Sequence, residues 1–127
     1  MIIAFSGGRD YTDYSLVLSV IDLLEILNPG FTIRVGCARG LDLMVRQITK
    51  TENIYVADWT NLKLGAGGER NRRMLQGGPL TYEKGQNYPI IKADLLIAFP
   101  GNNGTADCVK QAKSLNIRVV NIPAKVL

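Results

Sequence analysis

Three glycine-rich turns carry the residue types best suited to hold a phosphate group. Their sequences are SGGRD at residues 6–10, GCARG at residues 36–40 and PGNNGT at residues 100–105. Glycine lets the backbone approach a ligand closely, and a helix that follows such a turn offers free N–H groups with a partial positive charge. Arg9 and Arg39 add guanidinium groups that can bind phosphate through paired hydrogen bonds. Any one of these turns is also explained as a simple strand-to-helix connection, but three together favour a phosphate site.

A second group of candidate residues follows an apolar segment in the middle of the chain. Asp58 and Trp59 come directly after that segment, and Trp59 either stacks on an aromatic base or packs as a half-buried side chain. Further on, two glycines precede a basic stretch in which helical spacing puts Arg70 and Arg73 on one face. That face is either a solvated basic surface or part of a ligand site, and the glycine pair favours the ligand site.

The residue types that are missing exclude several kinds of chemistry. The chain has no histidine and only two cysteines, Cys37 and Cys108, with no CxxC spacing. A zinc centre or a Ser-His catalytic pair therefore has no parts to be built from. Without a histidine to lower a thiol pKa, we expect both cysteines to serve packing. We predict neither a metal site nor a resident cofactor.

The turns need a scaffold that brings them together, and the hydrophobic pattern supplies one. Short apolar runs predict strands at residues 2–5, 31–35, 54–57, 95–99 and 117–122, and helical periodicity predicts helices at 13–27, 41–48, 69–75 and 105–115. Residues 58–68 are polar and glycine-rich, and residues 76–88 show no periodicity and are predicted to form a loop. Alternating strands and helices indicate an α/β fold with a parallel sheet. Continuous apolar runs in the first, fourth and fifth strands predict that the sheet is covered on both faces, with the ligand at the carboxyl ends of the strands.

Size and composition fit a small globular protein. The chain has 127 residues, 46% of them hydrophobic and 20% charged, and we expect one domain over residues 1–127. No apolar run is long enough to span a bilayer and the N-terminus lacks the pattern of a signal peptide, so a cytoplasmic location is expected. The net charge of +4 suits an anionic ligand, but it is too small and scattered to indicate nucleic acid.

Taken in order and spacing, these motifs resemble the SLOG superfamily, and within it the small stand-alone bacterial and phage proteins called YspA-like. The motifs are GGRD at residues 7–10, GCARGLD at 36–42, ADW at 57–59, RNRRM at 70–74 and AFPGNNGTAD at 98–107. The superfamily also includes the Lonely Guy phosphoribohydrolases and the DNA-processing protein A family. The resemblance extends from Ile2 to about Val120. It implies one Rossmann-like three-layer domain with a five-stranded, mostly parallel sheet, a bacterial or phage origin, and a homo-oligomer of two or more subunits.

The resemblance to the Lonely Guy enzymes is incomplete at the residues that carry their chemistry. Those enzymes pair the arginine of an Arg-Lys-x-x-Met motif with the glutamate that ends Pro-Gly-Gly-x-Gly-Thr-x-x-Glu. Here Arg70 and Met74 match the first motif, but Cys108 stands at the position of the glutamate, directly after Asp107. Cleavage of an N-glycosidic bond calls for a carboxylate, and Asp107 points about 100° around the helix from the usual residue. The remaining candidates for that carboxylate are Asp10, Asp42 and Asp58.

Two further positions depart from the family pattern. Asn102 replaces the second glycine of the phosphate loop, which predicts either a narrower phosphate cradle or a left-handed backbone that asparagine tolerates. The stretch at residues 76–92 is longer than this branch usually carries, and we expect it to form a lid or an oligomer contact.

The sequence therefore predicts a protein that binds a phosphate-bearing nucleotide or a nucleotide-derived signalling molecule, as a sensor or a sequestering protein. An N-glycosidic hydrolase that uses Arg70 with Asp107 or Asp58 is the first alternative, and a single-stranded DNA-binding module is the second. The low aromatic content, 7%, argues against the DNA module. Thr105 is expected to donate its hydroxyl to a phosphate, to cap the following helix, or both. The residues expected to line the site are Gly7, Gly8, Arg9, Gly36, Arg39, Gly40, Asp58, Trp59, Arg70, Asn71, Gly101, Asn102, Gly104 and Thr105.

Overall fold

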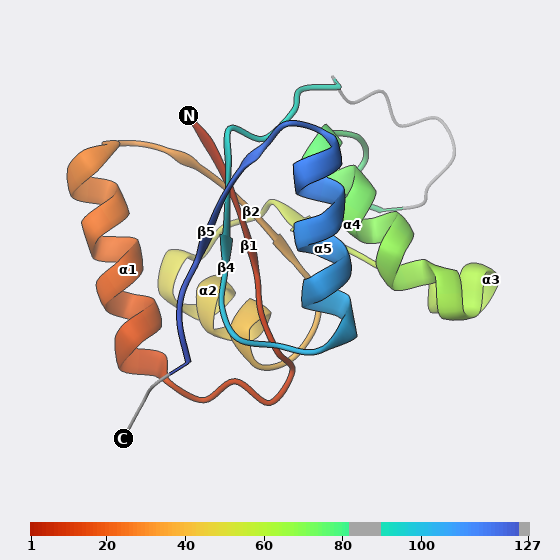
Figure 1. Ribbon diagram of the computed structural model, residues 1–127, viewed down its shortest axis with the longest axis horizontal. Coiled ribbons are helices and arrows are strands. Elements are labelled where there is room, and N and C mark those ends of the chain that lie inside the picture. Colours follow the sequence, from red (N-terminus) through yellow and green to blue (C-terminus); the bar gives the residue numbers. More distant parts are fainter. Residues whose placement is uncertain (82–89, 125–127) are drawn as a thin grey trace.

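The computed structural model describes residues 1–81 and 90–124 and shows an α/β fold built on one parallel sheet (Figure 1). The strands are β1 (Ile2–Ser6), β2 (Thr32–Gly36), β3 (Ile54–Tyr55), β4 (Leu95–Ala98) and β5 (Arg118–Asn121). The helices are α1 (Tyr14–Leu27), α2 (Leu41–Thr49), α3 (Trp59–Leu62), the short 3-10 helix η1 (Lys63–Gly65), α4 (Ala66–Gln76) and α5 (Asn103–Ser114). The five strands lie in the order β3-β2-β1-β4-β5, and all neighbouring pairs are parallel. The predicted Rossmann-like fold class is confirmed.

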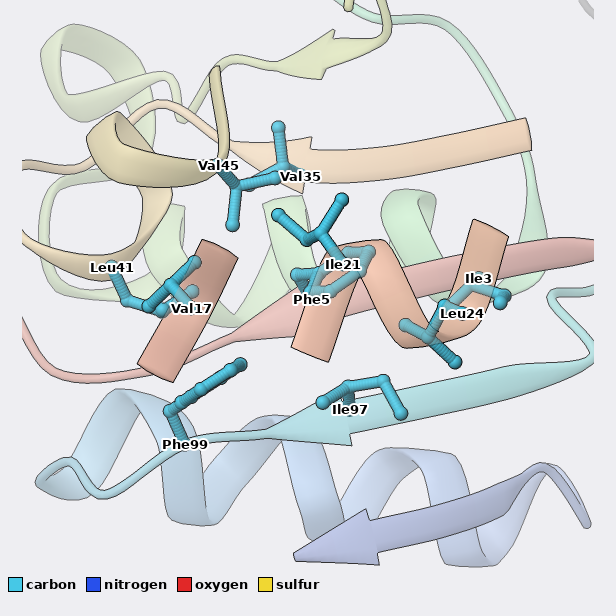
Figure 2. Packing of buried hydrophobic residues seen from close by; sticks show 10 residues of the cluster. All are labelled: Ile3, Phe5, Val17, Ile21, Leu24, Val35, Leu41, Val45, Ile97 and Phe99. Atoms are coloured by element: carbon cyan, nitrogen blue, oxygen red, sulfur yellow. The ribbon is translucent and has the colours of Figure 1, made fainter. Parts of the chain in front are cut away.

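Side chains that alternate along the inner strands pack into two separate cores, one on each face of the sheet. Ile3 and Phe5 of β1 point into the first core, together with apolar side chains of α1 and α2 (Figure 2). Ala4 points to the opposite face, where the second core contains side chains of α4 and α5, among them Met74 and Cys108. The period of two along a strand thus gives a three-layer arrangement of helices, sheet and helices.

The strand order places a topological switch at the centre of the sheet. From β1 the chain moves outward through β2 to β3, and it then returns to the other side of β1 to form β4 and β5. Ser6 at the end of β1 lies in register with Ala98 of β4, and Phe5 lies in register with Val35 of β2. The segments that follow these three strands therefore leave the sheet at the same edge, which is where ligands bind in open α/β sheets.

Three local features differ from the expectation for a fully covered sheet joined by simple loops. The polar segment at 58–68 is largely helical, since it contains α3, η1 and the start of α4. The Asp58 carboxylate caps α3 by accepting a hydrogen bond from the Asn61 N–H at 3.2 Å. Helix α4 begins at Ala66, three residues before the predicted start. Strand β5 is an edge strand with three of its four residues exposed, among them Val120, so the prediction that it is covered on both faces was wrong.

Part of the predicted 76–92 insert, residues 82–89, lies outside the described residues. Among the described residues, no helix has the length and apolar character needed to cross a membrane.

Candidate functional site

A cavity of about 540 Å³ opens at the carboxyl edge of the sheet, between the starts of α2 and α5 and the side of α4. Its wall contains eleven of the residues predicted to bind a ligand, which are Gly7, Gly8, Arg9, Gly36, Arg39, Trp59, Arg70, Asn71, Asn102, Gly104 and Thr105. Asp107, the predicted partner of Arg70, lines it as well. The structure thus brings the three glycine-rich turns together around one hollow.

Hydrogen bonds between the turns fix their relative positions. The Gly8 N–H donates to the Pro100 carbonyl at 2.9 Å, and the Gly8 carbonyl accepts a hydrogen bond from the Leu41 N–H at 3.1 Å. These contacts tie the turn after β1 to the turn after β4 and to the first residue of α2. A side chain at Gly7 would lie 2.5 Å from Leu41 Cγ, and one at Gly8 would lie 3.1 Å from the Gly101 Cα. Close packing therefore excludes a side chain at Gly7, and at Gly8 it leaves room for one only if the neighbouring backbone shifts.

The N-terminus of α5 presents unused hydrogen-bond donors to the cavity. The backbone N–H groups of Asn103, Gly104 and Thr105 have no acceptor among the described residues, and the Asn102 side chain does not cap the helix. The Thr105 hydroxyl lies against Gly101 and makes no hydrogen bond to the described part of the chain. Asn102 has a φ of −102°, so this substitution for glycine does not require the left-handed backbone considered from the sequence. Such a helix start is a suitable site for an anion.

Arg70 is buried beside this helix start, with its guanidinium over the end of β2. Its Nε donates to Asn71 Oδ1 at 3.1 Å and its Nη1 donates to Cys37 Sγ at 3.6 Å. A Cβ added at Gly36 would overlap the Arg70 guanidinium, so the absence of a side chain there makes room for it. The residue is only 9% exposed, and the described carboxylates that form ion pairs, Asp10 and Glu69, pair with other arginines. Asp42 lies near the guanidinium but not within ion-pair distance. A buried cation with no direct carboxylate contact is suited to bind an anionic ligand.

Asp107 faces the cavity through a network that joins α4 to α5. Its Oδ2 accepts hydrogen bonds from Asn71 Nδ2 at 3.0 Å and from Gln111 Nε2 at 2.8 Å. Asn71 also donates to the Gly104 carbonyl at 3.2 Å, which links the network to the start of α5. Cys108, one position further, is fully buried in the second core, and burial raises the pKa of its thiol to about 12. On the described helix, then, the carboxylate at the cavity is Asp107, and Cys108 points into the core.

Asp42 is an additional carboxylate at the cavity floor, absent from the predicted ligand set although considered as a carboxylate candidate. It lies in the first turn of α2 and is 5% exposed. Burial raises its pKa to about 6, although Arg70, the Ala38 N–H, Arg46 and Arg9 all favour the ionised form. The signal in the sequence was an acidic residue two positions after the glycine that ends the second turn.

The outer rim of the cavity is aromatic and basic. The Arg9 guanidinium lies over the Trp59 ring, 5.4 Å from its centroid, and Trp59 is 47% exposed. This exposure is compatible with both roles left open for Trp59, stacking on a base and half-buried packing. A smaller hollow of about 260 Å³ continues beside this pair and shares Arg9, Trp59 and Arg70 with the main cavity. Arg39 is exposed at the rim and forms an ion pair with Asp10 at 3.3 Å.

Three predicted ligand residues, Gly40, Asp58 and Gly101, do not line the cavity. Gly40 has a φ of +72°, and a side chain there would overlap the Gly8 carbonyl, so it shapes the wall from behind. Gly101 has the same role, because a side chain would lie 2.8 Å from the Gly8 nitrogen. Asp58 caps α3.

Arg73, predicted on the same face as Arg70, does not line the cavity either. It is buried against Glu69, whose carboxylate accepts a hydrogen bond from its Nε at 2.7 Å, and it also donates to the Pro79 carbonyl at 2.9 Å. Cavity residues absent from the predicted ligand set include Ser6, Leu64, Gly65 and Asn103.

Comparison with known proteins adds no family assignment. No family model, no curated protein and no solved structure matches the chain.

Proposed function

We propose that the protein binds a phosphate-bearing nucleotide or a nucleotide-derived signalling molecule and acts as a sensor or a sequestering protein. The observation that carries the proposal is the convergence of two kinds of unused donor on one cavity. These are the free N–H groups at the start of α5 and the buried guanidinium of Arg70. A phosphate accepts hydrogen bonds from both and neutralises the buried charge.

The aromatic rim supports a ligand that carries a base as well as a phosphate. Trp59 follows β3, whereas the start of α5 follows β4, three strands away in the sheet. Neighbouring strands lie about 4.8 Å apart, so the two features are separated by roughly 14 Å at the level of the sheet. A cavity that is anion-binding at one end and aromatic at the other suits a nucleotide better than inorganic phosphate.

The experiment that tests the proposal is calorimetric titration with AMP, NAD and ADP-ribose of the unmodified protein and two arginine variants. Arg70→Gln is expected to weaken binding about tenfold to a hundredfold, because a charged donor to the phosphate is lost. Arg72→Gln is the matched control, since Arg72 lies on the same helix, pairs with Glu69 at 3.2 Å and does not line the cavity. Absence of binding by all three ligands, or equal losses in both variants, would refute the proposal.

An N-glycosidic hydrolase is the second candidate, favoured by the position of Asp107. The carboxylate that the chemistry needs lines the same cavity as Arg70, and two side-chain amides hold it there. Water would add to C1′ of the ribose as the bond to the base breaks, with the base leaving as the protonated product. Incubation with the same three compounds, followed by chromatography for free base, tests this activity. Release that is lost in Asp107→Asn supports the hydrolase, and binding without release leaves the sensor or sequestering role.

A further inference from the structure

The Asp42 carboxylate lies on the floor of the cavity with one oxygen unused. Its Oδ2 accepts a hydrogen bond from the Ala38 N–H at 3.2 Å, and Oδ1 accepts none from the described residues. A Cβ added at Gly36 would lie 2.6 Å from Oδ2 and closer still to Arg70 Nη1, so Asp42 and Arg70 flank the same open point. The two side chains nevertheless form no ion pair among the described residues. Both side chains, and Gly36 between them, line the cavity.

A carboxylate with a free oxygen selects the chemistry of its partner. It repels a phosphate, and it favours an uncharged group that donates hydrogen bonds, such as a hydroxyl. Because Asp42 is almost fully buried, a hydroxyl that it binds is shielded from water, which makes loss of that hydrogen bond costly.

The order of the site's features along the sheet edge indicates which hydroxyl of a nucleotide would reach Asp42. The start of α5 follows β4, Asp42 follows β2 and Trp59 follows β3, in the sheet order β3-β2-β1-β4. Asp42 thus lies between the end proposed for the phosphate and the end proposed for the base. In a nucleotide the group between those two parts is the ribose.

We infer that Asp42 accepts hydrogen bonds from the 2′- and 3′-hydroxyls of a ribose, which makes the site selective for ribonucleotides over deoxyribonucleotides. The inference rests on the proposed function, because the position of the ribose in the cavity depends on where the phosphate and the base bind. Asp42 is then a specificity-determining residue of the same cavity.

The test is a calorimetric comparison of each ribonucleoside 5′-monophosphate with its 2′-deoxy and 3′-deoxy analogues. For the unmodified protein we expect at least one deoxy analogue to bind about tenfold more weakly than its parent, since a hydrogen bond to a charged group is removed. In Asp42→Asn the ratio is expected to fall to about twofold, because affinity for the parent drops while affinity for the analogue does not. Asp10→Asn is the matched control, as it removes the same charge from the exposed rim. It should change all the affinities by a common factor.

A second measurement on the unmodified protein does not depend on any variant. The ratio of ribonucleotide to deoxyribonucleotide affinity should fall as the pH is lowered from about 7.5 to about 5, because Asp42 becomes protonated. The charged groups that act on its carboxylate are Arg70, Arg46 and Arg9. The nucleotide phosphate also titrates in this pH range, but it does so in both ligands. Its effect therefore cancels in the ratio of the two affinities.

The outcomes separate the inference from the proposed function. Ratios near one in the unmodified protein, or a large ratio that survives in Asp42→Asn or at low pH, overturn the inference while nucleotide binding stands. If none of the monophosphates binds, the proposed function fails, and the inference fails with it.

Discussion

Asp42 shows how a single residue can be suited to binding at the expense of stability. Its carboxyl has a pKa raised by burial to about 6, so the folded protein favours the neutral form. The contribution of this preference to the free energy of unfolding is complete below the ordinary pKa near 3.8, and it is lost as the pH rises through about 6. Asp42→Asn should therefore stabilise the protein by about 3 kcal/mol near neutral pH, and the gain should largely disappear toward pH 4. Thermal unfolding of both proteins across this range measures the difference, and a variant that is less stable at pH 7 would contradict the assignment.

Gly36 is the residue that leaves room for both charged groups on the cavity floor. A methyl group there would lie 2.6 Å from Asp42 Oδ2 and would overlap the buried Arg70 guanidinium. Gly36→Ala should therefore weaken nucleotide binding by at least about tenfold, because it displaces a charged donor. Gly65→Ala is the matched control in the same cavity wall, since nothing described lies within 4 Å of the added methyl group. Equal affinities in the two variants would argue against this role for Gly36.

Trp59 offers a direct optical test of where the base lies, because it is the only tryptophan in the chain. A base that stacks on the indole displaces the Arg9 guanidinium and is expected to quench the tryptophan fluorescence. Ribose 5-phosphate, which lacks a base, should bind without this change. Equal quenching by the nucleotide and by ribose 5-phosphate would show that the signal does not come from stacking.

At the scale of elements, helix α5 presents one face to the cavity and another, about 100° around the helix, to the second core. Asp107 lines the cavity, whereas the Cys108 thiol is fully buried with a pKa raised to about 12. Because the thiol stays protonated at pH 8, iodoacetamide should leave Cys108 unlabelled in the native protein and label it after unfolding. Peptide mass spectrometry assigns the label to Cys37 or Cys108. Rapid native labelling of Cys108 would mean that α5 is not packed as described.

The same elements show what periodicity predicts well and what it does not. Apolar spacing located α1, α2 and α5 because each packs one face on a core. It did not reveal α3, which buries no residue and depends on a local cap from Asp58. Nor did it reveal the exposure of β5, because the sequence of a strand does not state whether it lies at an edge of the sheet.

At the scale of the whole molecule, the sequence predicted that the three glycine-rich turns converge, because the segments that follow parallel strands leave the sheet at one edge. That rule brought residues as distant in sequence as Arg9, Arg70 and Thr105 to one cavity. It could not separate residues that line the cavity from residues such as Gly40 and Gly101, which support the wall from behind. Asp42 was considered only as a carboxylate, because its burial arises from its place beside Gly36 and the Arg70 side chain in the folded chain and not from local spacing.

The central claim is that the carboxyl edge of the sheet holds the phosphate of a nucleotide. The measurement that tests it most directly is a paired calorimetric titration with adenosine, guanosine, cytidine and uridine and with the 5′-monophosphate of each. The account predicts that at least one monophosphate binds about a hundredfold more tightly than its own nucleoside, as expected for a phosphate held by several charge-assisted hydrogen bonds. A nucleoside that binds as tightly as its monophosphate would contradict the account.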